Sequence, residues 1–335
     1  MRSALGVALA IAFAVLAAAP AAAAERYAII ITGAAGTAEH ATQHGAWRDE
    51  LAAALRGSMK MPPEHIHLLG DVAAERKAQR TVGDDVDVSS RDQVRAAFAR
   101  LAPVLEKDDL LLVVLIGHAT FDGVDAKFNL VGPDLEAADW KALVAPIRGK
   151  VVFVNTAAAS APFLSRLAGE RRIVITATDS GVQRYETVFP RFFVQAFGEA
   201  ETDLDKDSRI SVWEAFARAS LGVRQYYRQK GQLTVEKPVL DDTGDGVGKD
   251  AGATGPDGAI ASRTFFDDAD DPARAGGPAL SELVARRNAL ESELDELKKR
   301  KDFMRLADYE KRRDEIVIDI ARVSRKIRTE QAGRS

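Results

Sequence analysis

Short apolar runs alternate with amphipathic stretches from about residue 27 to residue 240. The apolar runs have the length of strands and occur at Tyr27–Thr32, His65–Leu69, Leu110–Ile116, Val151–Asn155 and Ile173–Ala177. Helical spacing is found between them, at Ala46–Leu55, Ser90–Leu105, Ala137–Ala145 and Phe189–Gly198. Buried strands that alternate with helices are typical of a mostly parallel sheet covered on both faces. The sequence therefore predicts an α/β fold, with candidate sites at the carboxyl edge of the sheet.

The C-terminal part has a different pattern. Residues 243–278 are rich in Gly, Asp and Ala, which predicts a flexible linker. From 279 to 330, apolar residues recur at helical spacing: Leu283, Leu290, Leu294, Leu297, Ile316, Ile320, Val323 and Ile327. The pattern weakens around Asp302–Tyr309, so we expect a helical hairpin or coiled coil. Such an appendage would serve packing or homodimerisation, or it would dock a partner.

The N-terminus has the features of a signal peptide. Arg2 precedes an apolar stretch from Ala4 to Ala19, and Ala22–Ala24 has the small residues of a cleavage site. The alternative is a membrane anchor, but the stretch is Ala-rich and stops at Pro20. We predict that residues 1–24 are removed, that residues 25–242 form the α/β domain, and that the protein is exported to the periplasm or the extracellular space.

Composition excludes some functions. The 335 residues are 46% hydrophobic and carry a net charge of −4, so no broad basic surface indicates nucleic-acid binding. The chain has no cysteine, which excludes disulfides, thiolate metal sites and cysteine catalysis. No later stretch is long and apolar enough to cross a bilayer, so after signal removal we expect no stable membrane span.

Two predicted strands end in residues with candidate chemistry. Gly117–His118 follows the apolar run at Leu110–Ile116, and an alanine-rich turn, Thr156–Ser160, follows Val151–Asn155. Together with Tyr27–Gly33, Lys127–Leu135 and Ile175–Ser180, these segments resemble the legumain/caspase superfamily of cysteine peptidases, in particular an exported bacterial subgroup. The resemblance covers roughly residues 27–248. It implies a caspase-like three-layer sandwich in which a His and a Cys stand at the ends of these two strands.

The resemblance also implies that the nucleophile is lost. His118 would be the acid/base, whereas Ala158 occupies the Cys position and Ala119 stands where the family has Gly. A methyl group cannot attack a carbonyl, so we predict an inactive peptidase homologue in which His118 is a relic or a hydrogen-bonded polar residue. The alternative is a hydrolase with His118 as base and Ser160 as nucleophile. Since Ser160 lies two residues beyond the Cys position, its hydroxyl would be displaced.

An EF-hand-like loop is the second chemical signal. Residues 203–214 place oxygen donors at the spacing that Ca²⁺ requires. The predicted ligands are Asp203, Asp205, Asp207, the carbonyl of Arg209, Ser211 and Glu214. Ser208 stands where such loops have Gly, which predicts strain and weak affinity. An acidic helix N-terminus without an ion is the alternative interpretation. A second acidic stretch, Asp241–Gly246, lacks the final carboxylate and is better explained as a turn.

The remaining histidines give weaker signals. His40 and His44 lie on one face of a helix and could bind a metal, but no third ligand is evident from the sequence, so surface positions are expected. His65 and His67 alternate in a strand and indicate nothing more. The sequence as a whole favours an exported, calcium-binding pseudopeptidase that binds a peptide or protein. The alternatives are an active hydrolase and a calcium-responsive structural protein with an inert cleft.

Overall fold

The structure, a computed structural model, describes residues 24–253, 255–267 and 300–332, together with 282–283, 286–287, 289–290, 293–294 and 297–298. Nearly all of the predicted signal peptide, residues 1–23, lies outside the described residues. Among the described residues, no helix is long and apolar enough to pass through a bilayer.

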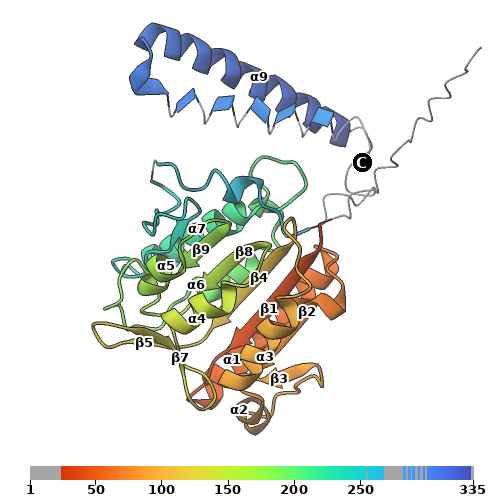
Figure 1. The fold of residues 1–335 in the computed structure, drawn as a ribbon, viewed down its shortest axis with the longest axis vertical. Coiled ribbons are helices and arrows are strands. Elements are labelled where there is room, and N and C mark those ends of the chain that lie inside the picture. The colour runs from red at the N-terminus through yellow and green to blue at the C-terminus, as the bar shows by residue number, and fades with distance from the viewer. Residues whose placement is uncertain are drawn as a thin grey trace, which may run out of the picture.

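A seven-stranded sheet forms the centre of the α/β body (Figure 1). Its strands, in spatial order, are β10 (Val239–Asp241), β9 (Arg172–Thr176), β8 (Lys150–Asn155), β4 (Leu110–Ile116), β1 (Arg26–Thr32), β2 (Ile66–Gly70) and β3 (Val86–Val88). Every pair is parallel except β10 with β9. β4 and β1 lie at the centre and are buried on both faces, which explains their continuous apolar sequence.

Helices cover both faces of this sheet. One face packs against α1 (Ala38–Gly57), α6 (Phe189–Gln195) and α7 (Val212–Gln229). The other packs against α3 (Arg91–Leu101), α4 (Ala137–Val144) and α5 (Ala161–Leu167). Thr37, Ser90 and Ser211 cap α1, α3 and α7 by accepting backbone N–H bonds, as their polar side chains favour. The predicted three-layer α/β sandwich is confirmed.

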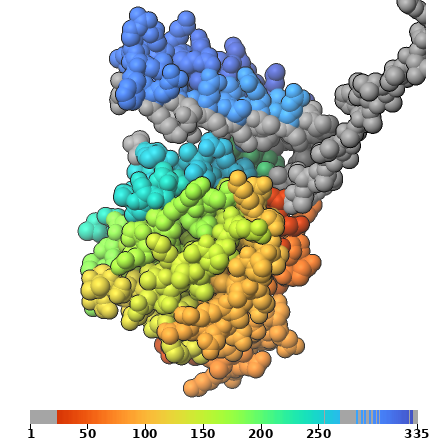
Figure 2. Space-filling view, viewed as in Figure 1, coloured from red at the N-terminus to blue at the C-terminus, as the bar shows by residue number. Residues whose placement is uncertain are grey.

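Smaller elements complete the body. A second, antiparallel sheet contains β5 (Ala119–Phe121), β6 (Ala126–Phe128) and β7 (Leu135–Glu136), directly after His118. The short helical elements are α2 (Val72–Lys77), η1 (Pro63–His65), η2 (Ala200–Thr202), η3 (Ala261–Arg263) and η4 (Lys301–Phe303). In the space-filling view, the part of the chain coloured from red to cyan forms one continuous surface on the side shown (Figure 2).

Residues 243–253 and 255–267 differ from the expected flexible linker. This segment folds back onto the body, where Phe266 is fully buried and Lys249 pairs with Leu240 beside β10. Asp242 accepts N–H bonds from Gly258, Ile260 and Ala261, and buried Asp241 is likewise satisfied by backbone N–H groups. The Asp and Gly residues that suggested disorder are therefore turn residues with defined partners. The rest of the expected linker, 268–278, lies outside the described residues.

The predicted C-terminal helix is present as α9 (Leu306–Ala332). It lies outside the three layers of the body (Figure 1). Leu290 and Leu297 pack with Tyr309 and Ile316, so two segments of the predicted apolar seam face each other. The chain turns between them at residues 300–305, where the helical pattern weakens.

Candidate functional site

The sheet brings His118 and the alanine-rich turn to one edge. β4 and β8 pair in parallel with Leu115 opposite Asn155, so the residues that follow both strands emerge together. Gly117 has φ of 151°, and a Cβ on it would lie 3.1 Å from the backbone nitrogen of Gly33. Glycine is therefore needed at this position for the chain to turn out of β4 into His118.

At this edge, Ala158 presents only a methyl group and is 8% exposed. Ser160 is fully buried. Its hydroxyl accepts the backbone N–H of Thr178 and is 3.1 Å from the Thr178 hydroxyl, while the Ser160 N–H donates to that same hydroxyl. The Ser160 oxygen is thus engaged between two loops and turned away from solvent.

Three histidines converge beside this edge of the sheet. The edge, formed by the residues that follow β4 and β8, is called the rim below. The Nε2 atom of His118 is 3.3 Å from Nδ1 of His40, and Nε2 of His40 is 3.2 Å from a carboxylate oxygen of Glu186. The His40 and His44 rings stack one helical turn apart with centroids 5.5 Å apart, and both meet the His118 ring edge-on. The expected surface position of His44 is wrong, because this residue is only 4% exposed. The sequence pattern of α1 does not reveal the third histidine, His118, because it follows β4 and is 74 residues from His44 in the sequence.

Burial disfavours the charged form of His44 and of His118. It lowers the pKa of His44 to about 3, helped by the neighbouring His118 and His40. It also lowers the pKa of His118, an effect that His40 strengthens and that Glu186 and a hydrogen bond to the backbone of Ala35 oppose. Neutral His118 can accept a proton or a metal ion through a ring nitrogen.

A cavity of about 510 Å³ adjoins the cluster on the α1, α6 and α7 side of the sheet. His40 and Glu186 belong to its wall, so the contacts that begin at His118 reach this cavity. The remaining lining residues are Glu39, Gln43, Trp47, Tyr185, Thr187, Val188, Arg191, Tyr226, Tyr227, Gln232 and Val235. Four aromatic rings together with charges of both signs suit the side chains of a peptide.

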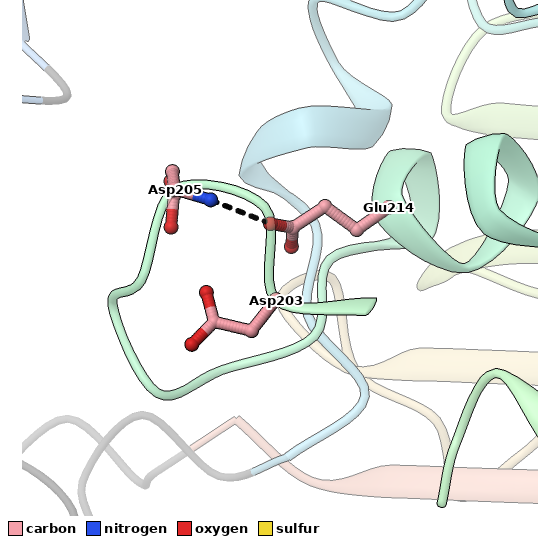
Figure 3. Close-up of side chains that lie close together, drawn as sticks. All are labelled: Asp203, Asp205 and Glu214. Atoms are coloured by element: carbon pink, nitrogen blue, oxygen red, sulfur yellow. Dashed lines mark hydrogen bonds between the residues drawn. The ribbon is translucent and has the colours of Figure 1, made fainter. Parts of the chain in front are cut away.

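The acidic loop lies between η2 and α7 (Figure 3). Oxygens of Asp203, Asp205 and Glu214 lie within 4.8 Å of one another. Glu214 accepts the N–H groups of Leu204 and Ser211 at 2.8 and 2.9 Å, and Asp203 accepts those of Asp207 and Ser208. Hydrogen bonds from backbone N–H groups to these carboxylates thus stabilise the conformation in which the three side chains converge.

Positions within the loop follow the EF-hand pattern in part. Ser208 has φ of 67°, the left-handed conformation for which such loops use Gly. Ser211 and Glu214 form a reciprocal cap at the start of α7, as an acidic helix N-terminus without an ion would also do. The Arg209 side chain pairs with Asp267, so its guanidinium does not neutralise the loop carboxylates.

A cation from the C-terminal part reaches the loop. Nη2 of Arg287 is 2.9 Å from both Asp205 and Asp207, and Arg287 is 2% exposed. Loss of hydration raises the pKa of Asp207 and Glu214, and it raises that of Asp205 although 44% of that side chain is exposed. Arg287 opposes this shift at both aspartates. No local sequence pattern predicts this contact, because Arg287 and Asp207 are 80 residues apart in the sequence.

Comparisons with known proteins concern the arrangement of elements only. Caspase-1 from Spodoptera frugiperda is similar with a TM-score of 0.42 and 10% identity, over 65% of this chain and 86% of the caspase. Protein GSU0716 from Geobacter sulfurreducens is similar with a TM-score of 0.46 and 14% identity, over 73% of this chain and 99% of that protein. No protein-family model and no curated protein matches the chain.

Proposed function

We propose that this chain is an exported, calcium-binding pseudopeptidase that binds a peptide or protein segment and does not cleave it. The observation that carries the proposal is the residue at the nucleophile position: Ala158 offers a methyl group at the edge where His118 emerges. Acyl transfer needs a nucleophile activated by a neighbouring base, and a methyl group supplies none.

The neighbouring hydroxyl does not replace the lost nucleophile. Ser160 is buried, and its oxygen is shared with the backbone and hydroxyl of Thr178. A serine nucleophile has to be exposed and within hydrogen-bond reach of its base. The His118 Nε2 atom is 3.3 Å from Nδ1 of His40, so the ring is paired with another imidazole. This geometry favours binding over catalysis.

The cavity supports a binding function. It is about 510 Å³, which is within the range of small-ligand sites, and its wall contains Trp47 and three tyrosines. Tyr185 is 74% exposed at its mouth. Exposed aromatic rings beside charged groups are the usual anchors of protein and peptide contacts.

Calcium is proposed as a stabilising ion in the loop 203–214. Asp203, Asp205 and Glu214 converge, and a hard cation with oxygen ligands would relieve the repulsion between them. Since the loop joins η2 to α7, and α7 contributes to the cavity wall, an ion there would fix one side of the binding region.

Ligand binding can be tested by retention of a random peptide library on the immobilised full chain in calcium, read by mass spectrometry. We expect a retained subset of peptides with a common residue preference. Tyr185→Ala should weaken their binding about tenfold, or roughly 1.4 kcal/mol. Val182→Ala is the matched control, because it is 71% exposed in the same loop and outside the cavity. Equal retention by wild type and Tyr185→Ala, or no retention, would contradict the proposal.

Calcium binding can be tested by calorimetric titration of the full chain. We expect one site that is lost in the Asp203→Ala/Glu214→Ala double variant and kept in Asp245→Ala, which removes an exposed carboxylate from the turn at 241–246. Because truncating Glu214 also removes the α7 cap, Asp205→Asn is a milder second variant. An unchanged titration signal in both loop variants would show that the loop is not the site.

A further inference from the structure

The three histidines beside the rim have the spacing of a transition-metal site. His40 and His44 lie four positions apart on α1. In this i, i+4 arrangement, two imidazoles on one helix face can bind zinc. His118 comes to the same point from the end of β4. Imidazole nitrogens are borderline ligands that suit Zn²⁺, Co²⁺ or Ni²⁺ rather than Ca²⁺.

The nitrogen distance between His40 and His118 and the distances between the three ring centroids are close to those of imidazoles that share one ion. With metal–nitrogen bonds of about 2.0–2.1 Å, two nitrogens of a tetrahedral site lie about 3.3 Å apart, and the ring centroids about 5.2 Å apart. The observed distance between the His40 and His118 nitrogens is 3.3 Å. The three centroid distances are 4.7, 5.3 and 5.5 Å.

A buried nitrogen atom without a hydrogen-bond partner also favours a metal site. His44 is 4% exposed, and within the described part of the chain its Nδ1 atom has no hydrogen-bond partner. A buried polar atom costs about 1–3 kcal/mol when it is left unpaired. A metal ion would provide the missing partner.

Glu186 is placed to support such an ion. One of its carboxylate oxygens lies 3.2 Å from Nε2 of His40, the ring nitrogen opposite the one that faces His118. Metal-binding histidines commonly donate their second N–H to a carboxylate, which fixes the tautomer and the ring orientation. The cluster therefore contains the three ligands and one orienting carboxylate.

We propose that His40, His44 and His118 form a binding site for a divalent transition metal such as Zn²⁺, oriented by Glu186 and separate from the calcium loop. Three protein ligands leave a fourth position open towards a further donor. Because His40 and Glu186 also line the cavity, that position would be accessible to an oxygen or nitrogen atom of a bound ligand. The nitrogens of the three rings do not all lie within 4.8 Å of one another, so binding requires the His44 ring to turn.

The test is a Co²⁺ titration of the chelator-treated full chain in saturating Ca²⁺, followed by visible absorption. Saturating Ca²⁺ keeps the acidic loop from contributing. We expect one equivalent of Co²⁺ with the d–d bands of a four- or five-coordinate site, displaced by Zn²⁺. His40→Gln and His118→Gln should each weaken binding at least about 100-fold, and Glu186→Gln by about 10–100-fold. His67→Gln, in β2, should leave binding unchanged.

Folding of each variant is checked by circular dichroism. His44 is the most buried of the three, so the two other variants decide the outcome if His44→Gln does not fold. Absence of Co²⁺ bands in the folded wild type would overturn the proposal. Bands that persist in a His40→Gln/His118→Gln double variant would also overturn it.

Discussion

Among single residues, Ser160 has the contacts of a structural hydroxyl rather than those of a nucleophile. Its oxygen accepts the Thr178 N–H inside the protein, so Ser160→Ala leaves that donor unpaired. We expect a loss of about 1–3 kcal/mol in the free energy of unfolding, measured in urea. Ser165→Ala is the control, because its hydroxyl is exposed and makes one long bond. Equal stability of the two variants would show that the Ser160 pair does not support the rim.

Glu236 gives a pH-dependent stability. It is fully buried and accepts the N–H groups of Val188 and Phe189 at the start of α6, and burial raises its pKa to about 7. Because the folded pKa lies above the unfolded value, the contribution of Glu236 is complete below about pH 4.5 and is lost as pH rises through about 7. The loss is on the order of 3 kcal/mol.

Glu236→Gln isolates this effect from other titrating groups. Glutamine stays neutral, so the unfolding free energy of the variant relative to wild type should rise between about pH 4.5 and about pH 7. The measurement is urea unfolding at several pH values. Parallel pH profiles for the two proteins would contradict the assigned role of Glu236.

At the element scale, the backbone of the loop at 203–214 limits calcium affinity. Ser208 has φ of 67°, which costs a residue with a side chain about 1 kcal/mol relative to Gly. Ser208→Gly should therefore tighten Ca²⁺ binding about fivefold in a calorimetric titration. Gly231→Ala is a matched test of the same conformation outside the loop, since Gly231 has φ of 64° just after α7. It should lower stability and leave calcium affinity unchanged. Weaker binding by Ser208→Gly would exclude strain at this position as the limit.

Arg287 links the loop to the C-terminal segment. It pairs with Asp205 and Asp207, which are predicted calcium ligands, so the guanidinium and a calcium ion would compete for the same oxygens. Arg287→Gln should tighten Ca²⁺ binding severalfold, because a competing cation is removed. Arg286→Gln, an exposed neighbour, should not. Unchanged or weaker binding in Arg287→Gln would show that the guanidinium supports the loop rather than competes with the ion.

At the scale of the whole molecule, the sheet and its helices could be predicted from sequence. Continuous apolar runs such as Leu110–Ile116 and the polar caps of α1, α3 and α7 carry strong local signals. The order of the segments placed His118 and Ala158 at one edge, because parallel strands end together. The homodimer through residues 279–330 stays a prediction.

The contacts that join distant segments were not predictable in the same way. The histidine cluster depends on α1 lying against the end of β4, and Arg287 depends on a return of the chain to the loop. Neither is encoded in local spacing. The opposite difficulty is found at residues 243–253 and 255–267. A Gly- and Asp-rich composition is shared by flexible linkers and by ordered turns, and the burial of Phe266 shows that this segment is ordered against the body.

The proposed pseudopeptidase would bind a peptide at the edge that carries His118 and Ala158 without cleaving it. This is tested by incubating a diverse peptide library with the full chain in calcium, from acid to neutral pH, beside His118→Ala, and reading hydrolysis by mass spectrometry. We expect no cleavage by either folded protein. Cleavage by the wild type that disappears in His118→Ala would contradict it and would show that another nucleophile acts with His118.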